Sequence, residues 1–197
     1  MGLDVQAVNG LTRIPDEDVP DGVQPWNDEF YQWESDEDTY IKHINRDPDS
    51  RFEEYWSNHL NPFETGYYRD EGDGQYSFRV GSYSYYNYWR KLLALSIGFE
   101  NIGDVWKLGP YNESIPFIEL IDFSDADGMI GPNVSEKLYN DFEGMQEKVF
   151  EFIDNLMFGV IPGNKLNMNQ VRDFKIVYND WKLAFDIARE NGLVILQ

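Results

Sequence analysis

The segment between positions 75 and 98 constrains the fold most, because its hydrophobic period changes partway along. Residues 76–80 alternate between apolar and polar side chains, as in a strand that buries one face. In residues 86–97 apolar side chains recur three or four positions apart, the period of a helix that buries one stripe. A short hydroxyl side chain, Ser82 or Ser84, can cap that helix. The segment therefore predicts a strand, a tight turn and a helix in direct succession.

Polar side chains gather around this predicted turn and the first two turns of the helix. Free amides and the positive end of the helix dipole favour an anionic or carbonyl-rich ligand at such a place. Serines that cap and tyrosines that pack would explain the same residues without a ligand. The candidate ligand-binding residues are Arg79, Ser82, Tyr83, Ser84, Tyr86, Asn87 and Arg90.

A second polar corner follows residues 115–121, whose apolar run predicts a buried strand. Loops at strand ends are common positions for polar sites. The candidate residues here are Asp122, Ser124, Asp125 and Asp127. An EF-hand is excluded, because Phe123 and Val134 stand where that loop requires oxygen ligands. A looser cation site, a carboxylate pair for acid–base chemistry and a plain turn before a helix stay open.

Both corners connect a strand to a helix, so we expect them to face one another across a cleft. Arginine can bind phosphate through two parallel hydrogen bonds, carboxylates can accept hydrogen bonds from sugar hydroxyls, and tyrosines can stack on a base. This mixture suits a nucleotide-like or sugar-like molecule. The sequence has no glycine-rich phosphate loop, nucleophile elbow or histidine–carboxylate zinc motif. That favours binding over catalysis, and neither a cofactor nor a metal is predicted.

Composition limits the classes of protein to which the chain can belong. At 197 residues, 16% of them aromatic, one domain spanning residues 1–197 with a substantial core is expected. The formal net charge of −20 disfavours binding to a phosphate backbone. The absence of cysteine excludes disulfide scaffolds and cysteine nucleophiles, and the sequence shows neither a long apolar run nor the basic, apolar region expected of a signal peptide. We therefore expect a soluble cytoplasmic protein with neither a nucleic-acid nor a membrane partner.

The periodicities along the chain predict an α+β fold. It consists of a small mixed, mostly antiparallel sheet of four or five strands, covered by three main helices, with long acidic and aromatic loops. The strands are predicted at 3–8, 39–44, 76–80, 115–121 and 193–196. The helices are predicted at about 83–97, 133–156 and 171–188, with Gly98 and Asn191–Gly192 as stops. The loops are predicted at 15–38, 45–74, 99–114 and 158–168.

Several blocks of the sequence resemble an uncharacterised family of phage and prophage proteins. Members of that family begin Met-Gly-Leu-Asp, contain Gly-Ser-Tyr-Ser-Gly-Tyr-Asn-x-Trp-Arg and Ser-Asp-Cys-Glu-Gly-x-Ile-Gly, and end in a short strand with a final His. The matching blocks are residues 1–4, 79–90, 116–131 and 178–181, in the same order. The sequence departs from the pattern at Tyr85, Ala126, Asp127 and Gln197. The resemblance implies a viral or prophage origin and no particular reaction, and Ala126 argues against a cysteine nucleophile.

Three functions remain open from the sequence. The leading hypothesis is a phage-encoded accessory protein that sequesters a polar, nucleotide-like small molecule and so counters host defence signalling. The second is a hydrolase of a phosphoester or glycosidic bond that uses Asp122, Asp125 and Asp127 as carboxylates or metal ligands. The third is an acidic interaction protein, or DNA mimic, that blocks a basic host partner. All three place the protein in the cytoplasm of the infected host cell, and a homo-oligomer is compatible with each.

Overall fold

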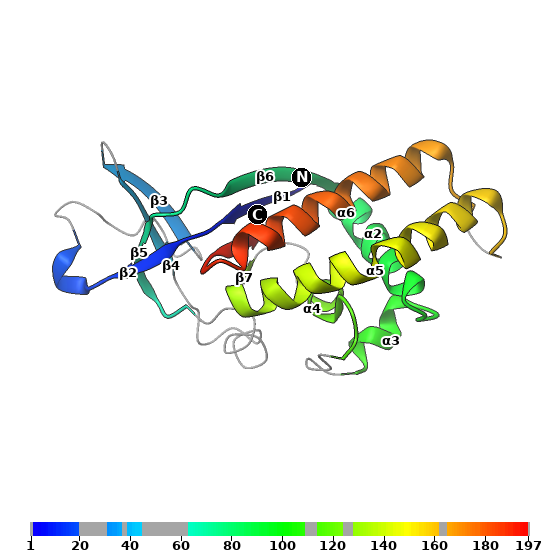
Figure 1. Cartoon of the computed structure of the whole chain (residues 1–197), viewed down its shortest axis with the longest axis horizontal. Coiled ribbons are helices and arrows are strands. Elements are labelled where there is room, and N and C mark those ends of the chain that lie inside the picture. The colour runs from blue at the N-terminus through cyan, green and yellow to red at the C-terminus, as the bar shows by residue number, and fades with distance from the viewer. Residues whose placement is uncertain are drawn as a thin grey trace.

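The computed structural model describes residues 2–19, 31–36, 39–44, 63–108, 114–123, 128–161 and 165–196, with 31–36 and 39–44 described by their backbone alone. Over these residues the strands form two four-stranded sheets, and the α-helices gather beside the first of them (Figure 1). The second sheet lies at the opposite end of the long axis from the helices. The predicted α+β class is confirmed, and the second sheet is an addition to it.

The first sheet has the strand order β6-β1-β8-β7, and each neighbouring pair is antiparallel. Its strands are β1 (Gly2–Val8), β6 (Gln75–Ser82), β7 (Gly128–Ile130) and β8 (Leu193–Leu196). β1, β6 and β8 lie where the sequence predicts strands, because each shows either a clear alternation or a short apolar run. β7 was not predicted, since three residues are too few to show a period.

The second sheet has the order β2-β5-β4-β3 and is also antiparallel throughout. Its strands are β2 (Leu11–Ile14), β3 (Tyr31–Asp36), β4 (Thr39–Ile44) and β5 (Gly66–Asp70). Of these only β4 was predicted. The prediction of loops over 15–38 and 45–74 is therefore wrong at β3 and β5. The alternation in β3 covers only residues 31–34, and β5 shows none. Both form strands because neighbouring strands complete their hydrogen bonds.

A long two-stranded ribbon joins the two sheets. β1 continues into β2, and the antiparallel β5 continues into β6. The ribbon extends from the pair Ile14–Tyr67 in the second sheet to the pair Gly2–Ser82 in the first. Figure 1 shows β1 and β2 running along the molecule from one sheet to the other. The two sheets are therefore not independent, because they share the same pair of chain segments.

The ribbon changes sheets at Asn9 and Gly10, where the backbones approach unusually closely. The Asn9 amide donates to the Gly74 carbonyl at 3.2 Å, and the Gly74 amide donates to the Asn9 side-chain oxygen at 2.9 Å. The Glu71 amide donates to the Gly10 carbonyl at 3.2 Å. A Cβ on Gly72 would overlap both the side-chain oxygen and the carbonyl of Asn9. The junction therefore requires glycine opposite Asn9.

The turn before β8 packs on the same junction. Gly10 donates its amide to the Glu190 carbonyl at 3.0 Å, and Leu11 donates its amide to the Asn191 carbonyl at 2.9 Å. In return the Asn191 side-chain amide donates to the Leu11 carbonyl at 2.6 Å. A Cβ on Gly192 would overlap the Val8 carbonyl. Three chain segments distant in sequence thus meet at one point.

Three long helices cover one face of the first sheet, as predicted. They are α2 (Tyr83–Ser96), α5 (Pro132–Phe158) and α6 (Met168–Ala188). α5 and α6 form an antiparallel pair that projects beyond the sheet (Figure 1). The Trp181 ring lies at the centre of the core, with centroids 5.3 Å from Phe78, 5.9 Å from Tyr86 and 5.5 Å from Phe185. One aromatic side chain thus contacts residues of the sheet, α2 and its own helix.

A second, smaller apolar cluster occupies the other face of the first sheet, where it meets the second sheet. Its members are Val8, Leu11, Phe63, Tyr68, Met129, Leu193 and Ile195. Because successive strand residues point to opposite faces, β8 contributes Leu193 and Ile195 here, and Val194 and Leu196 to the main core. β8 is therefore an uninterrupted apolar run because both of its faces are buried.

Two short helices replace a predicted strand and part of a predicted loop. α4 (Ile118–Asp122) lies where a strand was predicted over 115–121, and α3 (Ile102–Trp106) lies within the predicted loop 99–114. Residues 117–121 are buried on all sides, and a short, fully buried apolar run has the same appearance in a helix and in a strand. Phe117 has a φ of 61° and turns the chain into α4. The strand prediction is therefore wrong.

Two glycine substitutions should have opposite effects on stability. Gly72→Ala should lower the free energy of unfolding by about 1–3 kcal/mol or more, because the added methyl overlaps Asn9 in the junction. Gly144→Ala should raise it by about 0.5–1 kcal/mol, because this position of α5 has open space and alanine favours the helix. Urea unfolding followed by circular dichroism measures both. A Gly72→Ala variant as stable as the native protein would contradict the proposed close approach.

Candidate functional site

The turn between β6 and α2 is built from a β-bulge and a glycine. The pairing of β1 with β6 shifts between Leu3 and Asp4, whose partners are Gly81 and Arg79, so Val80 is the extra residue of the bulge. Gly81 has a φ of 125°, a backbone conformation that residues with a Cβ rarely adopt. The bulge places Val80 in the core and leaves Arg79 on the exposed face of the strand.

The first turn of α2 uses its polar residues mainly for structure. The Ser82 hydroxyl accepts a hydrogen bond from the Tyr85 amide at 3.1 Å, so Ser82, one of the two predicted candidates, caps the helix. Tyr83 is half-buried and packs against the main core, whereas Ser84 is exposed. Tyr86 is fully buried within the aromatic core. Of these four predicted ligand-binding residues, Ser82 and Ser84 are both exposed, and the hydroxyl of Ser82 is engaged in the cap.

Arg90 lies in the core, with 4% of its surface exposed. One terminal nitrogen, Nη1, donates to the carbonyls of Ile121, at 3.2 Å, and Phe123. The other, Nη2, donates to the side-chain oxygen of Asn87, and the guanidinium lies 4.5 Å from the centre of the Tyr86 ring. A cation is favourable at these carbonyls, because they terminate α4. Arg90 thus joins the two predicted corners by a direct contact.

Asp122, the last residue of α4, lies half-buried beside Arg90. Burial raises the pKa of its carboxyl to about 6, and the positive charge of Arg90 opposes that rise. The structure therefore brings Arg90, Asn87 and Asp122 together. The other predicted residues of this corner, Ser124, Asp125 and Asp127, lie outside the described residues.

Arg79 belongs to a different surface from Arg90. Its side chain is 61% exposed, and Nη1 lies 3.1 Å from the Asp4 carboxylate across the β1–β6 pair. Its other terminal nitrogen, Nη2, lies above Gly2, where a Cβ would approach it to 2.6 Å. Glycine at position 2 thus leaves room for the guanidinium to lie along the strand pair.

A hollow of about 410 Å³ opens next to this ion pair. It is lined by Asp4, Val5, Gln6, Ser77 and Phe78 of β1 and β6. Carboxylate, amide and hydroxyl groups here can donate or accept hydrogen bonds, and Arg79 adds a positive charge at the edge. Sequence reasoning selected Arg79 but missed the contribution of β1. The sequence did contain an indication of this face, because Asp4 and Gln6 alternate with the apolar residues of β1.

A buried ion cluster fastens α4 to α5. The Lys137 ammonium lies 2.6 Å from the Glu119 carboxylate and 2.8 Å from the Asp141 carboxylate, and it donates to the Ile115 carbonyl at 2.9 Å. Glu119 is only 2% exposed, so burial raises the pKa of its carboxyl, and Lys137 opposes that rise. Asp141 also accepts a hydrogen bond from the Phe117 amide at 2.8 Å. These charges satisfy one another and hold the left-handed turn at Phe117.

No family model matches the chain, and neither a curated protein nor a solved structure shows significant similarity to it. In the part of the chain that the structure describes, no three His, Cys, Asp or Glu side chains come together as ligands for a metal ion. Within the same residues, no helix has the length and apolar character needed to cross a bilayer. The geometry of the described residues is thus the basis for a functional proposal.

Replacing Arg90 should destabilise the fold. Arg90→Met leaves the carbonyls of Ile121 and Phe123 buried without their donor, so we expect a loss of about 2–4 kcal/mol in the free energy of unfolding. The control is Arg69→Met, an exposed arginine paired with Glu71 at 3.4 Å, which should change stability by less than about 0.5 kcal/mol. Urea unfolding compares the two variants. Equal stability of Arg90→Met and the native protein would refute the structural role.

Asp122 should make stability depend on pH. Its pKa of about 6 in the folded protein exceeds the ordinary value of 3.8, so the folded state holds this proton more tightly. The contribution to stability is therefore full below about pH 4 and is lost as the pH rises through about 6. Asp122→Asn should be more stable than the native protein at pH 7, and its advantage should disappear by pH 4.

Thermal unfolding at several pH values, with Asp16→Asn as control, tests the role of Asp122. Asp16 is exposed in a 3-10 helix, so its replacement removes the same charge without removing a buried carboxyl. An identical pH profile for both variants would show that net charge alone is responsible.

Proposed function

We propose that this protein is a binding protein that captures a polar, nucleotide-like small molecule on the exposed face of β1 and β6. The observation that carries the proposal is the hollow of about 410 Å³ between Asp4, Gln6 and Ser77, next to the Arg79 guanidinium. Such a hollow offers hydrogen-bond donors, acceptors and one cation within a small area. These are the groups that recognise phosphates and sugar hydroxyls.

Arg79 is the residue best suited to bind an anionic group. Asp4 engages Nη1 and orients the guanidinium along the strand pair. Nη2 lies above Gly2, where no side chain covers it from below. A phosphate oxygen bound at Nη2 would be held by a guanidinium that Asp4 has already positioned, which lowers the entropic cost of binding.

The resemblance to phage proteins supports the same location. Its first two blocks, residues 1–4 and 79–90, are distant in sequence, but Gly2–Asp4 pairs with Arg79–Ser82 in the sheet. A phage-encoded protein that withholds a nucleotide-like signal would serve the virus by silencing a host defence. In this proposal Arg90 and Asn87 support the fold, and Arg79 contacts the ligand.

Calorimetry against a panel of nucleotides, cyclic nucleotides and sugar phosphates tests this proposal. We expect one class to bind, and Arg79→Ala to weaken its affinity at least about tenfold, as expected for loss of a charged hydrogen bond. The control is Arg69→Ala, which removes an exposed arginine of β5 that is also ion-paired, in the second sheet. Affinity should be unchanged in this control.

Three outcomes would overturn the proposal. Equal effects of Arg79→Ala and Arg69→Ala would place binding elsewhere. A ligand recovered with altered mass would indicate hydrolysis in place of sequestration. A panel without any binder would favour an acidic interaction protein, consistent with the exposed Glu136, Glu147 and Glu151 of α5.

A further inference from the structure

The exposed residues of α6 contrast with those of the neighbouring helix α5. Those of α6 are Met168, Asn169, Gln170, Arg172, Ile176, Asn179 and Leu183. Not one of these is acidic, although the chain has 36 acidic residues. On the neighbouring helix α5, by contrast, the exposed residues include Glu136, Glu143, Glu147 and Glu151. The exposed glutamates therefore lie on α5, whereas on α6 the partly exposed carboxylates Asp173 and Asp186 are ion-paired.

The carboxylates that α6 does carry are all engaged within the chain. Asp180 accepts a hydrogen bond from the Tyr76 hydroxyl at 2.7 Å. Asp173 is paired with Arg172 at 3.2 Å, and Asp186 is paired with Arg189 at 2.7 Å. The flanks of the exposed face are therefore locally neutralised, and its centre carries no negative charge.

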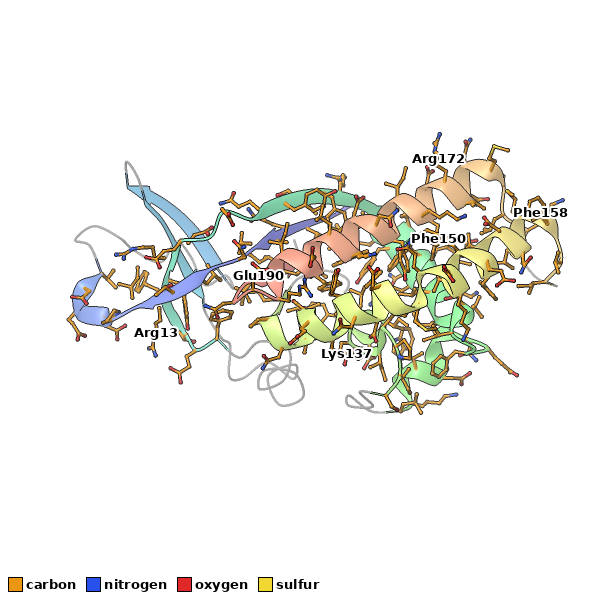
Figure 2. The ribbon with its side chains drawn as sticks, viewed as in Figure 1. Arg13, Lys137, Phe150, Phe158, Arg172 and Glu190 are labelled. Atoms are coloured by element: carbon orange, nitrogen blue, oxygen red, sulfur yellow. The ribbon has the colours of Figure 1, made fainter. Side chains whose placement is uncertain are left out.

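Five exposed residues of α6 form a single stripe: Met168, Arg172, Ile176, Asn179 and Leu183. They lie within about 80° of one another around a helix with 3.6 residues per turn. Met168, Ile176 and Leu183 are 76%, 50% and 42% exposed. Figure 2 shows Arg172 on the outer side of α6, away from α5. The stripe thus has apolar side chains at both ends and at its centre, with polar ones between them.

We infer that a second copy of this chain binds along this stripe, with the two α6 helices antiparallel. In that arrangement a two-fold axis passes next to Ile176, which meets its own counterpart. Met168 of each copy then meets Leu183 of the other, and Arg172 can donate to the Asn179 side-chain oxygen. The sequence of the stripe reads apolar, polar, apolar, polar, apolar in both directions, as an isologous interface requires.

The net charge of the chain supports a second copy as the molecule that binds the α6 stripe. Two molecules with a net charge of −20 repel one another, so close contact needs a surface from which carboxylates are missing. The α6 stripe has that property and carries apolar side chains that gain from burial. A helix of 21 residues is about 31 Å long and about 10 Å wide, so the contact covers about 300 Å² per copy. That is well below the usual ~800 Å², and the dimer is therefore weak and favoured by salt.

Sedimentation at increasing protein concentration and two salt concentrations tests the inference. We expect a reversible monomer–dimer equilibrium that strengthens with salt, and Ile176→Glu should weaken it at least about tenfold, because it places two carboxylates together at the axis. The control is Leu108→Glu, an apolar residue of similar exposure beyond the end of α3. A monomer at every concentration, or equal effects of the two variants, would overturn the inference.

Cysteine cross-linking tests the orientation, because the native chain has no cysteine. Ile176→Cys should form a disulfide-linked dimer on mild oxidation. Met168→Cys and Leu183→Cys should cross-link with each other when mixed, but not each with itself. Asn140→Cys, an exposed position of α5, is the control and should stay monomeric. A Met168→Cys variant that links to itself would show a parallel pairing, and a reaction at Ile176→Cys no faster than at Asn140→Cys would show that α6 is not the interface.

Discussion

The close approach of three backbone segments at Asn9 is the constraint on which the rest of the structure depends. β1 and β2, the turn over residues 71–74 and the turn before β8 meet there, and hydrogen bonds connect all three. The three segments can approach this closely because positions 72 and 192 are glycines, where a Cβ would overlap Asn9 or Val8. Because the same ribbon serves both sheets, the junction sets the register of each. It also positions β8 between β1 and β7, where both faces of that strand are buried.

Two cations, the buried Arg90 and the partly buried Lys137, hold α4 against the helices on either side of it. Arg90 of α2 binds the carbonyls at its C-terminal end, and Lys137 of α5 pairs with Glu119 within it. A helix of five residues has too few internal hydrogen bonds to be stable alone, so these contacts decide its conformation. Among the corner residues that the structure describes, Ser82, Asn87 and Arg90 thus contribute to the fold. The proposed ligand surface lies instead on the exposed face of β1 and β6, around Arg79 and Asp4.

Charged side chains are distributed differently over α5, α6 and the exposed face of β1 and β6. Exposed glutamates line α5, the exposed residues of α6 lack carboxylates, and the β1–β6 face combines an arginine with an aspartate. Across α5 and α6 the pairs Lys175–Asp154 and Lys182–Glu143 neutralise the seam between the helices. The proposed ligand site and the proposed dimer face lie on different elements, so each can operate without the other.

The sequence by itself determined the elements that show either a clear hydrophobic period or an uninterrupted apolar run. It predicted α2, α5 and α6, the strands β1, β4, β6 and β8, the cap at Ser82 and the α+β class. Only the tertiary structure decided the short elements β2, β3, β5 and β7 and the helical conformation of 118–122. Their hydrogen bonds come from partners remote in the chain, which the sequence alone does not identify. Tertiary packing also decided the roles of the predicted site residues. Residue type identified Arg79 and Arg90, but packing alone placed one in solvent and the other in the core.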